Sequence, residues 1–472
     1  MIMEHFEQTK NQAFPVRHAF GLLLLFGLLV RVLFLTCPGT EDMDSFRMWA
    51  AQACRHGLLQ MYRESDTDIL TSAYLIRQHI YLHRRFYDDT DLGPLTASPD
   101  HPPGMMVMLD ASARLFKMIN GGPLRLGKLL NACVNLPPVL FSLGITLLVW
   151  WFAGSEKLPQ SLFAVTAFWL NPALILASPL LGYQDSMFAF FGLLSLVLFY
   201  RRRYSWSALA FAASCISKPE GMLLIPVLAA AAWADGGFRG VLRYSFRVGL
   251  FASAMLLPYA LTHHLLAVFA HVFTLITDPA LSGQELNVWW LVGPLISWVS
   301  GNPVVDASGM VRMYPRSVFM HWAGFGPAWI ADGAVGIFIV LAMKMFLKQM
   351  KLGNRLALFW AGGVVVYGYT MLSLFVHENH LTAFFVYVAP MLALQVKNIK
   401  RLYLALSVVF GLNLYLFEGF GQNVKAGVQW LRVLPGFDVT ILIALINIGL
   451  FLILFRARHW WFNLTAKDSY QP

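Results

Sequence analysis

The sequence has few charged residues and few cysteines, and it contains no internal repeat or low-complexity tract. Charged residues make up 13% of the 472 residues, whereas 58% are hydrophobic. A soluble domain cannot cover its surface with so few charges, so the composition excludes that class and indicates a polytopic membrane protein. Because no linker divides the chain, we expect a single membrane domain over residues 1–472.

The scarcity of cysteine excludes two further classes of protein. The four cysteines are Cys37, Cys54, Cys133 and Cys215, and their spacing matches no zinc-binding motif. They are also too few for a disulfide-stapled scaffold. Cys37 and Cys54 fall on the same predicted side of the membrane, where they either form a disulfide or remain thiols.

The positive net charge has a topological explanation. The chain carries a formal charge of +10, and its Lys and Arg residues fall in short clusters between apolar runs, as at Arg201, Arg202 and Arg203. Cytoplasmic loops of membrane proteins carry this excess of basic residues. We therefore expect a lipid bilayer and no nucleic acid as a partner.

The apolar runs predict transmembrane helices. They are continuous rather than alternating and about 15 to 25 residues long, which suits helices and not a barrel. The basic clusters place both termini in the cytoplasm and predict about twelve crossings. The predicted crossings are 18–36, 126–152, 161–180, 183–200, 205–218, 220–234, 243–262, 328–346, 356–376, 380–396, 401–416 and 436–455. The first is followed by CPGTED rather than a cleavage site, which predicts a retained helix.

The segments that do not fit in lipid gather on one side. Segment 103–120 contains Asp110 and is either an interfacial helix or part of an extra pair of crossings that would raise the total to about fourteen. The long segments 37–102 and 263–327 both fall on the non-cytoplasmic side. Pieces 44–62 and 69–87 of the first have polar and apolar faces, as membrane-surface helices do.

The stretch TEDMDSFRMWA crowds carboxylates directly after the first crossing. Asp42 and Asp44 precede Phe46 and Trp49 on a predicted surface helix. One interpretation is a solvated acidic loop with aromatic anchors at the interface. The other is a carboxylate at the mouth of a cavity, acting as a general base. The spacing favours the second, because it places Phe46 and Trp49 one and two turns beyond Asp42.

Two short motifs open helices on the same side. SPDHPPG contains Asp100 and His101 ahead of two prolines that suit the first turn of a helix. GYQDS leaves so short a connection that Gln184 and Asp185 lie at the membrane boundary. Asp185 is either a helix cap or a functional carboxylate.

Three later motifs carry further polar residues. In SKPEG, Lys218 and Glu220 either reach the interface as a structural pair or attract a phosphate. In VHENH, His377 and His380 flank Glu378, and donating hydrogen bonds to a phosphate suits them better than binding zinc, since no second ligand cluster accompanies them. In SGQELNVWWL, an aromatic belt accounts for the tryptophans, while the polar residues before them suit sugar hydroxyls. Candidates here for lining a cavity or binding an acceptor are Asn287, Trp289 and Trp290.

In their order along the chain, these motifs resemble the GT-C class of integral-membrane glycosyltransferases. The resemblance is to dolichyl-phosphate-glucose glucosyltransferases of N-glycan assembly and their bacterial relatives, and it covers roughly residues 18–396. The stretches that carry it are Asp42 with Phe46, Trp49 and Ala50; Asp100-His101-Pro102-Pro103; Asn171 to Leu176; Gly182 to Ser186; Lys218-Pro219; Asn287 to Trp290; and His377-Glu378. His101 replaces the usual Tyr, and Gln184 is displaced by one position.

The resemblance implies an all-α GT-C fold with about 12 to 14 transmembrane helices. It also implies an inverting transfer of a single hexose, from a polyprenyl-phosphate donor to a glycan, glycolipid or protein hydroxyl. Asp42 or Asp44 would be the base. The donor would contact Gln184, Asp185, Lys218, His377, Glu378 and His380, and the acceptor side of the cavity would include Trp49, Asp100 and His101. No metal or other cofactor is implied, and we expect the bacterial inner membrane rather than the endoplasmic reticulum.

Two other functions fit many of the same features. A lipid-linked sugar flippase or transporter also has many helices and a few charges within the membrane, but the chain lacks the repeated halves typical of that class. An O-antigen-type ligase also uses lipid-linked donors, but it transfers a polymer. The order of the motifs and their common side favour the glycosyltransferase, and the other two remain the alternatives.

Overall fold

The protein is an all-α, multi-pass membrane protein, apart from one short hairpin. The computed structural model describes residues 2–40, 42–62, 99, 101–154, 158–276, 283–292, 327–393, 397–420, 433–434 and 437–456. Its elements are α1 (Ile2–Phe34), α2 (Asp42–His56), η1 (Gln60–Tyr62), α4 (Pro103–Asn120), α5 (Lys128–Ala153), α6 (Leu158–Trp169), α7 (Pro172–Ile175), η3 (Leu176–Leu180), α8 (Ser186–Tyr200), α9 (Tyr204–Ser217), η4 (Pro219–Leu224), α10 (Ile225–Leu261), α11 (Leu265–Ile276), α14 (Pro327–Lys351), α15 (Ala357–Leu372), α16 (Thr382–Ala393), α17 (Lys397–Glu418), β1 (Val433–Leu434), β2 (Phe437–Asp438) and α19 (Val439–Arg456).

The long apolar helices are suited to a bilayer. Among the described residues, four helices are long and apolar enough to cross a membrane, or five if the pair α6 and α7–η3, bent by 43°, counts as one span. Shorter apolar helices such as α8, α15, α16 and α19 add to this set. Each predicted crossing coincides with a described helix, with the bent pair α6 and α7–η3, or with part of η4 and α10, so the helical segments lie where the apolar runs predicted them.

The burial pattern is that of a helix bundle in lipid. Every residue of α16 is buried, and α15 is buried along nearly its whole length, so these two helices form the centre. The outer helices α1, α10 and α14 instead expose large apolar side chains, including Leu33, Leu250 and Ile337. An apolar outer surface of this size is stable against hydrocarbon and not against water.

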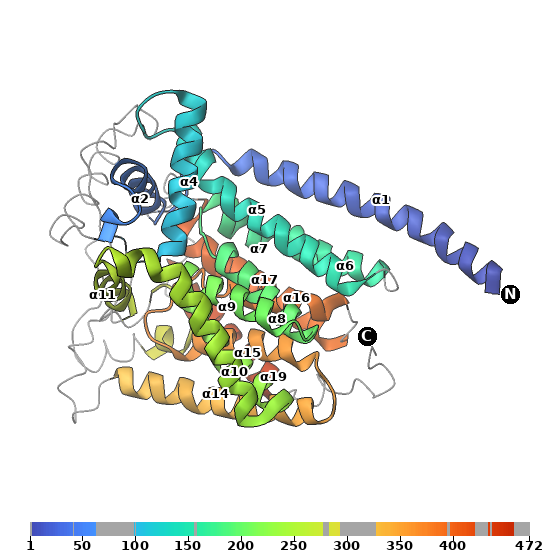
Figure 1. Ribbon diagram of the computed structural model, residues 1–472. Coiled ribbons are helices and arrows are strands. Elements are labelled where there is room, and N and C mark those ends of the chain that lie inside the picture. Colours follow the sequence, from blue (N-terminus) through green and yellow to red (C-terminus); the bar gives the residue numbers. More distant parts are fainter. Residues whose placement is uncertain are drawn as a thin grey trace.

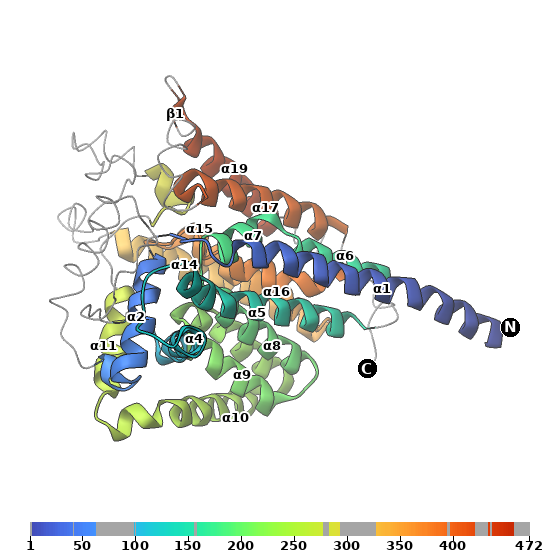
Figure 2. The same ribbon diagram turned by 90° about the horizontal axis from the view of Figure 1, so that it is seen from above.

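Helices α2, α4 and α11 gather at one end of the bundle, which we call the α2 end (Figures 1 and 2). Helix α4 runs across the other helices rather than along them (Figure 1). Of the two alternatives for segment 103–120, the structure therefore has the single interfacial helix. The predicted piece 44–62 is present as α2 and η1, whereas 69–87 lies outside the described residues.

Helix α10 makes two passes through the bundle. It follows Lys218 at the α2 end, and Asp235 near its middle pairs with Arg355 at the opposite end. There Gly236 and Gly237 have non-helical backbone angles, and the chain reverses. The second pass ends beside α11, back at the α2 end (Figure 2).

Candidate active site

A cavity of about 430 Å³ opens at the α2 end. Its wall comes from parts of the chain that are far apart in sequence: α2, the start of α4, the loop before α8, η4 and the loop between α15 and α16. The sequence-predicted residues that line it are Asp42, Trp49, His101, Gln184, Lys218, His377 and His380. These residues, which belong to different motifs, therefore lie around one cavity.

The two carboxylates of α2 have different surroundings. Asp42 is the first residue of the helix, is exposed and lines the cavity. Asp44 is buried, with 4% of its surface exposed, and accepts a hydrogen bond of 2.5 Å from Arg47. Arg47 also donates to the Pro38 carbonyl. Asp44 therefore belongs to a structural ion pair, and Asp42 is the carboxylate that a substrate can reach.

Aromatic rings stand beside Asp42. The ring centroids of Phe46 and Trp49 are 5.7 Å apart, and that of His101 lies 5.5 Å from Trp49 and 6.2 Å from Phe46. All three residues line the cavity. The main chain of His101 is held by Tyr62, whose hydroxyl donates to the His101 carbonyl at 2.7 Å. We call Phe46, Trp49 and His101 the aromatic wall.

The start of α2 is fastened to the loop before α8. The amide of Thr40 donates to the Leu181 carbonyl at 2.9 Å. Gly182 has φ +84°, and a Cβ atom there would overlap the side chain of Met43. Glycine thus allows both the left-handed backbone and the close approach that bring Gln184 and Asp185 near Asp42.

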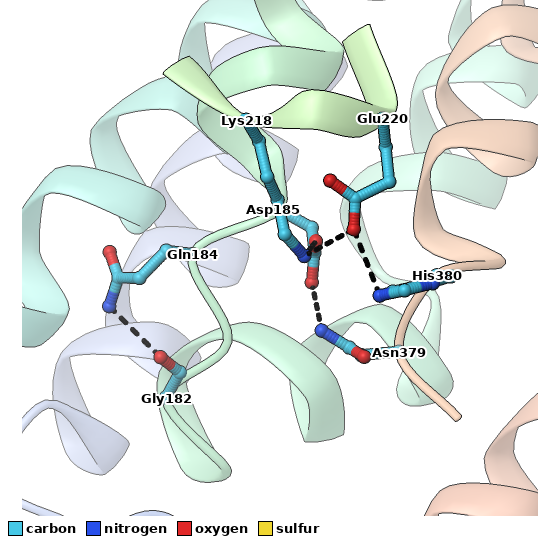
Figure 3. Close-up of polar contacts among 7 residues, drawn as sticks. All are labelled: Gly182, Gln184, Asp185, Lys218, Glu220, Asn379 and His380. Atoms are coloured by element: carbon cyan, nitrogen blue, oxygen red, sulfur yellow. Dashed lines mark hydrogen bonds and ion pairs between the residues drawn. The ribbon is translucent and has the colours of Figure 1, made fainter. Parts of the chain in front are cut away.

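Five side chains form a continuous polar network on another side of the cavity (Figure 3). Lys218 donates to Asp185 at 2.6 Å and lies 3.2 Å from Glu220. Asn379 donates to the second oxygen of Asp185 at 2.6 Å, and His380 Nε2 lies 2.9 Å from Glu220 Oε1. We call Asp185, Lys218, Glu220, Asn379 and His380 the polar cluster. It joins the start of α8, the start of η4 and the loop before α16.

The ammonium group of Lys218 is already compensated inside this cluster. Burial opposes its charged form, but the charges of Asp185 and Glu220 outweigh that effect and raise the pKa of Lys218 above its ordinary value. Two carboxylates thus face one ammonium group. This changes the expectation for Lys218, because its charge is not available to a donor phosphate.

Gln184 and His377 complete the predicted lining residues. The Gln184 amide donates to the Gly182 carbonyl at 2.9 Å, which stabilises the turn before α8. The main chain of His377 pairs with Gly283 and Gln284, so the second long segment lies against this loop. The His377 ring centroid lies 5.7 Å from that of His380, which places both imidazoles on the same part of the cavity.

Glu378 lies behind the cavity rather than in its lining. Tyr183, which does line the cavity, donates a hydrogen bond to the Glu378 carboxylate. Burial raises the pKa of Glu378 to about 8, and the charge of Glu418 adds to the shift. A pKa of about 8 favours the protonated form of this carboxyl group at neutral pH.

The residues of SGQELNVWWL have structural contacts. Asn287 donates to the Thr370 carbonyl at 3.0 Å and accepts from the amide of Trp289. The indoles of Trp289 and Trp290 donate to Leu372 and Thr440. Asn287, Trp289 and Trp290 are not among the described residues that line the cavity, which corrects the expectation that they do. Their polar groups form hydrogen bonds that hold this segment to the helices.

The polar residue before them has a similar role. Glu285 accepts hydrogen bonds from Asn413 at 3.0 Å and from Asn447 at 3.2 Å, on α17 and α19. It was expected to bind sugar hydroxyls, but both carboxylate oxygens are engaged inside the bundle. Burial raises the pKa of Glu285 well above its ordinary value.

Three further observations concern the predicted residues. Asp100 lies outside the described residues, so its position next to His101 stays a prediction. The structure has Cys37 and Cys54 as free thiols. Tyr183 and Asn379 were not singled out in the sequence, although both lie inside the quoted motifs; a polar side chain in a turn between two apolar runs was the available signal.

Comparison with known proteins finds a distant structural similarity. No protein-family model matches the sequence, and no curated protein matches it. The chain is similar to the archaeal oligosaccharyltransferase AglB from Archaeoglobus fulgidus, solved in complex with an inhibitory peptide and a dolichol-phosphate. The two share 14% identity with a TM-score of 0.40, over 93% of this chain and 55% of AglB. The chain thus spans about half the length of that protein, and the similarity is too low to assign a function.

Proposed function

We propose that the protein is a GT-C-type glycosyltransferase that moves a single hexose from a polyprenyl-phosphate donor to an acceptor hydroxyl. The observation that carries the proposal is the cavity at the α2 end, where the exposed carboxylate of Asp42 lies beside the aromatic wall and the polar cluster. A lipid-linked donor suits a cavity at the end of a membrane bundle, because its polyprenyl tail can remain in the bilayer while the sugar enters.

The proposed reaction is an inverting single displacement. The acceptor oxygen attacks the anomeric carbon as the bond from that carbon to the phosphate oxygen breaks. Asp42 takes the proton of the acceptor hydroxyl, which would otherwise be too weak a nucleophile. The polyprenyl phosphate departs with the electron pair as a stable anion, and His377 donates a hydrogen bond to it.

The cellular setting is part of the same proposal. The α2 end faces the non-cytoplasmic side, both termini are cytoplasmic, and the membrane is the bacterial inner membrane. The acceptor is a glycan, a glycolipid or a protein that reaches the cavity from that side. No nucleic acid is involved.

The decisive experiment is incubation of the purified protein with radiolabelled polyprenyl-phosphate hexose and a membrane extract as the source of acceptors. We expect transfer of one labelled sugar per acceptor. Movement of label across a vesicle membrane without formation of a glycosidic bond would instead identify a flippase. No transfer from this donor, together with transfer from a lipid-linked glycan polymer offered in its place, would identify a ligase.

Metal dependence gives a separate prediction. A lipid monophosphate leaving group does not require the divalent cation that a nucleotide diphosphate needs, so activity should survive treatment with EDTA. Turnover measured before and after chelation checks this. Loss of activity with EDTA and rescue by manganese or magnesium would mean that the carboxylates bind a cation instead.

A further inference from the structure

Three polar side-chain atoms of the polar cluster have no partner among the described residues. They are Glu220 Oε2, Asn379 Oδ1 and His380 Nδ1, and each atom is buried. All three residues line the cavity, with 5% of Asn379 and 10% of the Glu220 side chain exposed. Buried polar atoms are normally satisfied, because leaving one without a hydrogen bond destabilises the folded state. Three in one place indicate a bound group that supplies donors.

The other polar atoms of these residues explain why acceptors remain on Asn379 and Glu220. The Asn379 amide nitrogen donates to Asp185, so its oxygen points away from that carboxylate (Figure 3). The Nε2 atom of His380 contacts Glu220 Oε1, which leaves the Nδ1 atom of the ring for a hydroxyl group, and a hydroxyl can either donate or accept. Glu220 uses one oxygen for Lys218 and His380 and has the other left over.

The unpaired oxygens of Glu220 and Asn379 do not suit a phosphate at this position. A phosphate offers acceptors and negative charge, and the cluster presents acceptors and two carboxylates against one ammonium group. Hydroxyl groups have the opposite character, since each carries an O–H donor and no charge. The aromatic wall, also in the cavity lining, presents apolar faces of the kind that pack against the C–H groups of a sugar ring.

We infer that Glu220, Asn379 and His380 form a subsite that binds the hydroxyl groups of a non-anionic sugar. Asp185 and Lys218 orient these side chains without touching the sugar. This inference rests on the proposed function and refines it: the cluster holds the hexose of the donor, the phosphate lies toward His377, and sugars that carry a carboxylate are rejected. The earlier expectation that Lys218 and His380 bind the phosphate is thereby replaced.

The first test uses the unmodified protein and three lipids. Binding to the detergent-solubilised protein is measured for polyprenyl phosphate, polyprenyl-phosphate glucose and polyprenyl-phosphate glucuronic acid. We expect the glucose lipid to bind about tenfold more tightly than the sugar-free lipid, as about one or two charged-group hydrogen bonds would give. The glucuronic acid lipid should bind no more tightly than the sugar-free one. Tighter binding of the glucuronic acid lipid than of the glucose lipid would overturn the inference.

The second test separates sugar from phosphate with two variants. Glu220→Gln and Asn379→Ala should each weaken binding of polyprenyl-phosphate glucose about tenfold and leave binding of polyprenyl phosphate unchanged within about twofold. Asp235→Asn is the matched control, because it also alters a carboxylate in an ion pair but lies at the opposite end of the bundle; it should change neither affinity. Thermal unfolding establishes which variants fold, and if one does not, the other and the three-lipid comparison still decide.

The outcomes also distinguish this inference from the proposed function. Equal weakening of both lipids in the two variants would overturn the subsite and place the cluster at the phosphate. If the unmodified protein transfers sugar while both variants weaken the binding of the two lipids equally, the sugar subsite is rejected and the proposed function is retained. If it neither transfers sugar nor prefers the glucose lipid over polyprenyl phosphate, the proposed function fails with it.

Discussion

At the scale of single residues, Asp42 and Asp44 show how two carboxylates of one helical turn take different roles. Asp42→Asn keeps the size of the side chain and removes the base, so turnover should fall by about two to four orders of magnitude. Donor binding and the melting temperature should stay nearly unchanged, because Asp42 is exposed at the start of α2. Single-turnover rates and donor affinity measured on the same preparation check both expectations.

The matched change at Asp44 should act on stability instead. Asp44→Asn leaves the buried Arg47 without its carboxylate, and breaking a buried ion pair costs about 3 kcal/mol or more. The melting temperature should therefore fall, while the rate per folded molecule changes much less than in Asp42→Asn. A catalytic loss that is larger in a folded Asp44→Asn than in Asp42→Asn would move the base to Asp44.

Glu378 makes the stability of the protein dependent on pH. Its pKa is raised from 4.5 to about 8 by burial, so between these values the folded state holds a proton that the unfolded state has released. Stability is therefore highest below the lower value and is lost as the pH rises toward 8, at about 1 kcal/mol per pH unit. Above about pH 8 this contribution is constant.

Glu378→Gln should remove that dependence, because the amide is neutral at every pH and similar in size. Melting temperatures of the two proteins in detergent, compared from pH 5 to pH 9, check the prediction. As the pH rises to about 8, the melting temperature of the variant should increase relative to that of the unmodified protein. Above about pH 8 the difference between the two melting temperatures should stay constant. If the difference in melting temperature between the two proteins does not change with pH, Glu378 is ionised in the folded protein over the whole range from pH 5 to pH 9.

At the scale of elements, the breaks in the helices position the site. Asn171 caps α7 after the break that follows α6, accepting from the amide of Ala173 at 3.0 Å, and this bent pair leads into the loop that carries Gln184 and Asp185. Lys218 lies at the junction of α9 and η4. Polar side chains at such junctions reach the cavity without interrupting a helix inside the hydrocarbon.

The reversal of α10 depends on Gly237. Its backbone angles, φ +57° and ψ −152°, lie in a region that is essentially restricted to glycine. Gly237→Ala should destabilise the protein by about 1–3 kcal/mol through backbone strain, since open space surrounds the site and no clash contributes. Gly249→Ala is the control, because Gly249 lies within the regular part of the same helix in equally open space. Thermal unfolding should show a loss in the first variant and none in the second.

Most of these elements were predictable from the sequence, whereas several side-chain roles were not. The lengths of the apolar runs and the basic clusters predict the crossings from local sequence. A helix must be apolar over the thickness of the hydrocarbon, and basic residues are enriched in cytoplasmic loops. The spacing from Asp42 to Trp49 likewise places both residues on one helix face. In contrast, the partners of Glu285 on α17 and α19 are more than 120 residues away in sequence, and nothing local indicates them. The same holds for Asn379 and Asp185, which the packing of two helical hairpins brings together.

At the scale of the whole molecule, the distribution of charge predicts its orientation in the membrane. Arg201, Arg202 and Arg203 lie in the turn between α8 and α9, at the end opposite α2, and Arg355 pairs with Asp235 at that same end. The positive-inside rule places this end in the cytoplasm. The rule therefore predicts that the cavity opens on the other side of the membrane, where the proposed acceptor would be found.

Cysteine labelling tests this orientation. In a background with the four native cysteines replaced by alanine, Gln60→Cys introduces a thiol at the α2 end and Leu352→Cys one at the opposite end, both at exposed positions. A membrane-impermeant maleimide applied to intact spheroplasts should label the first variant, and it should label the second only after detergent is added. Neither substitution removes a basic residue, so the topological signal itself is unchanged. The reverse labelling pattern would place the cavity in the cytoplasm, and a donor presented on the outer side could not then reach Asp42.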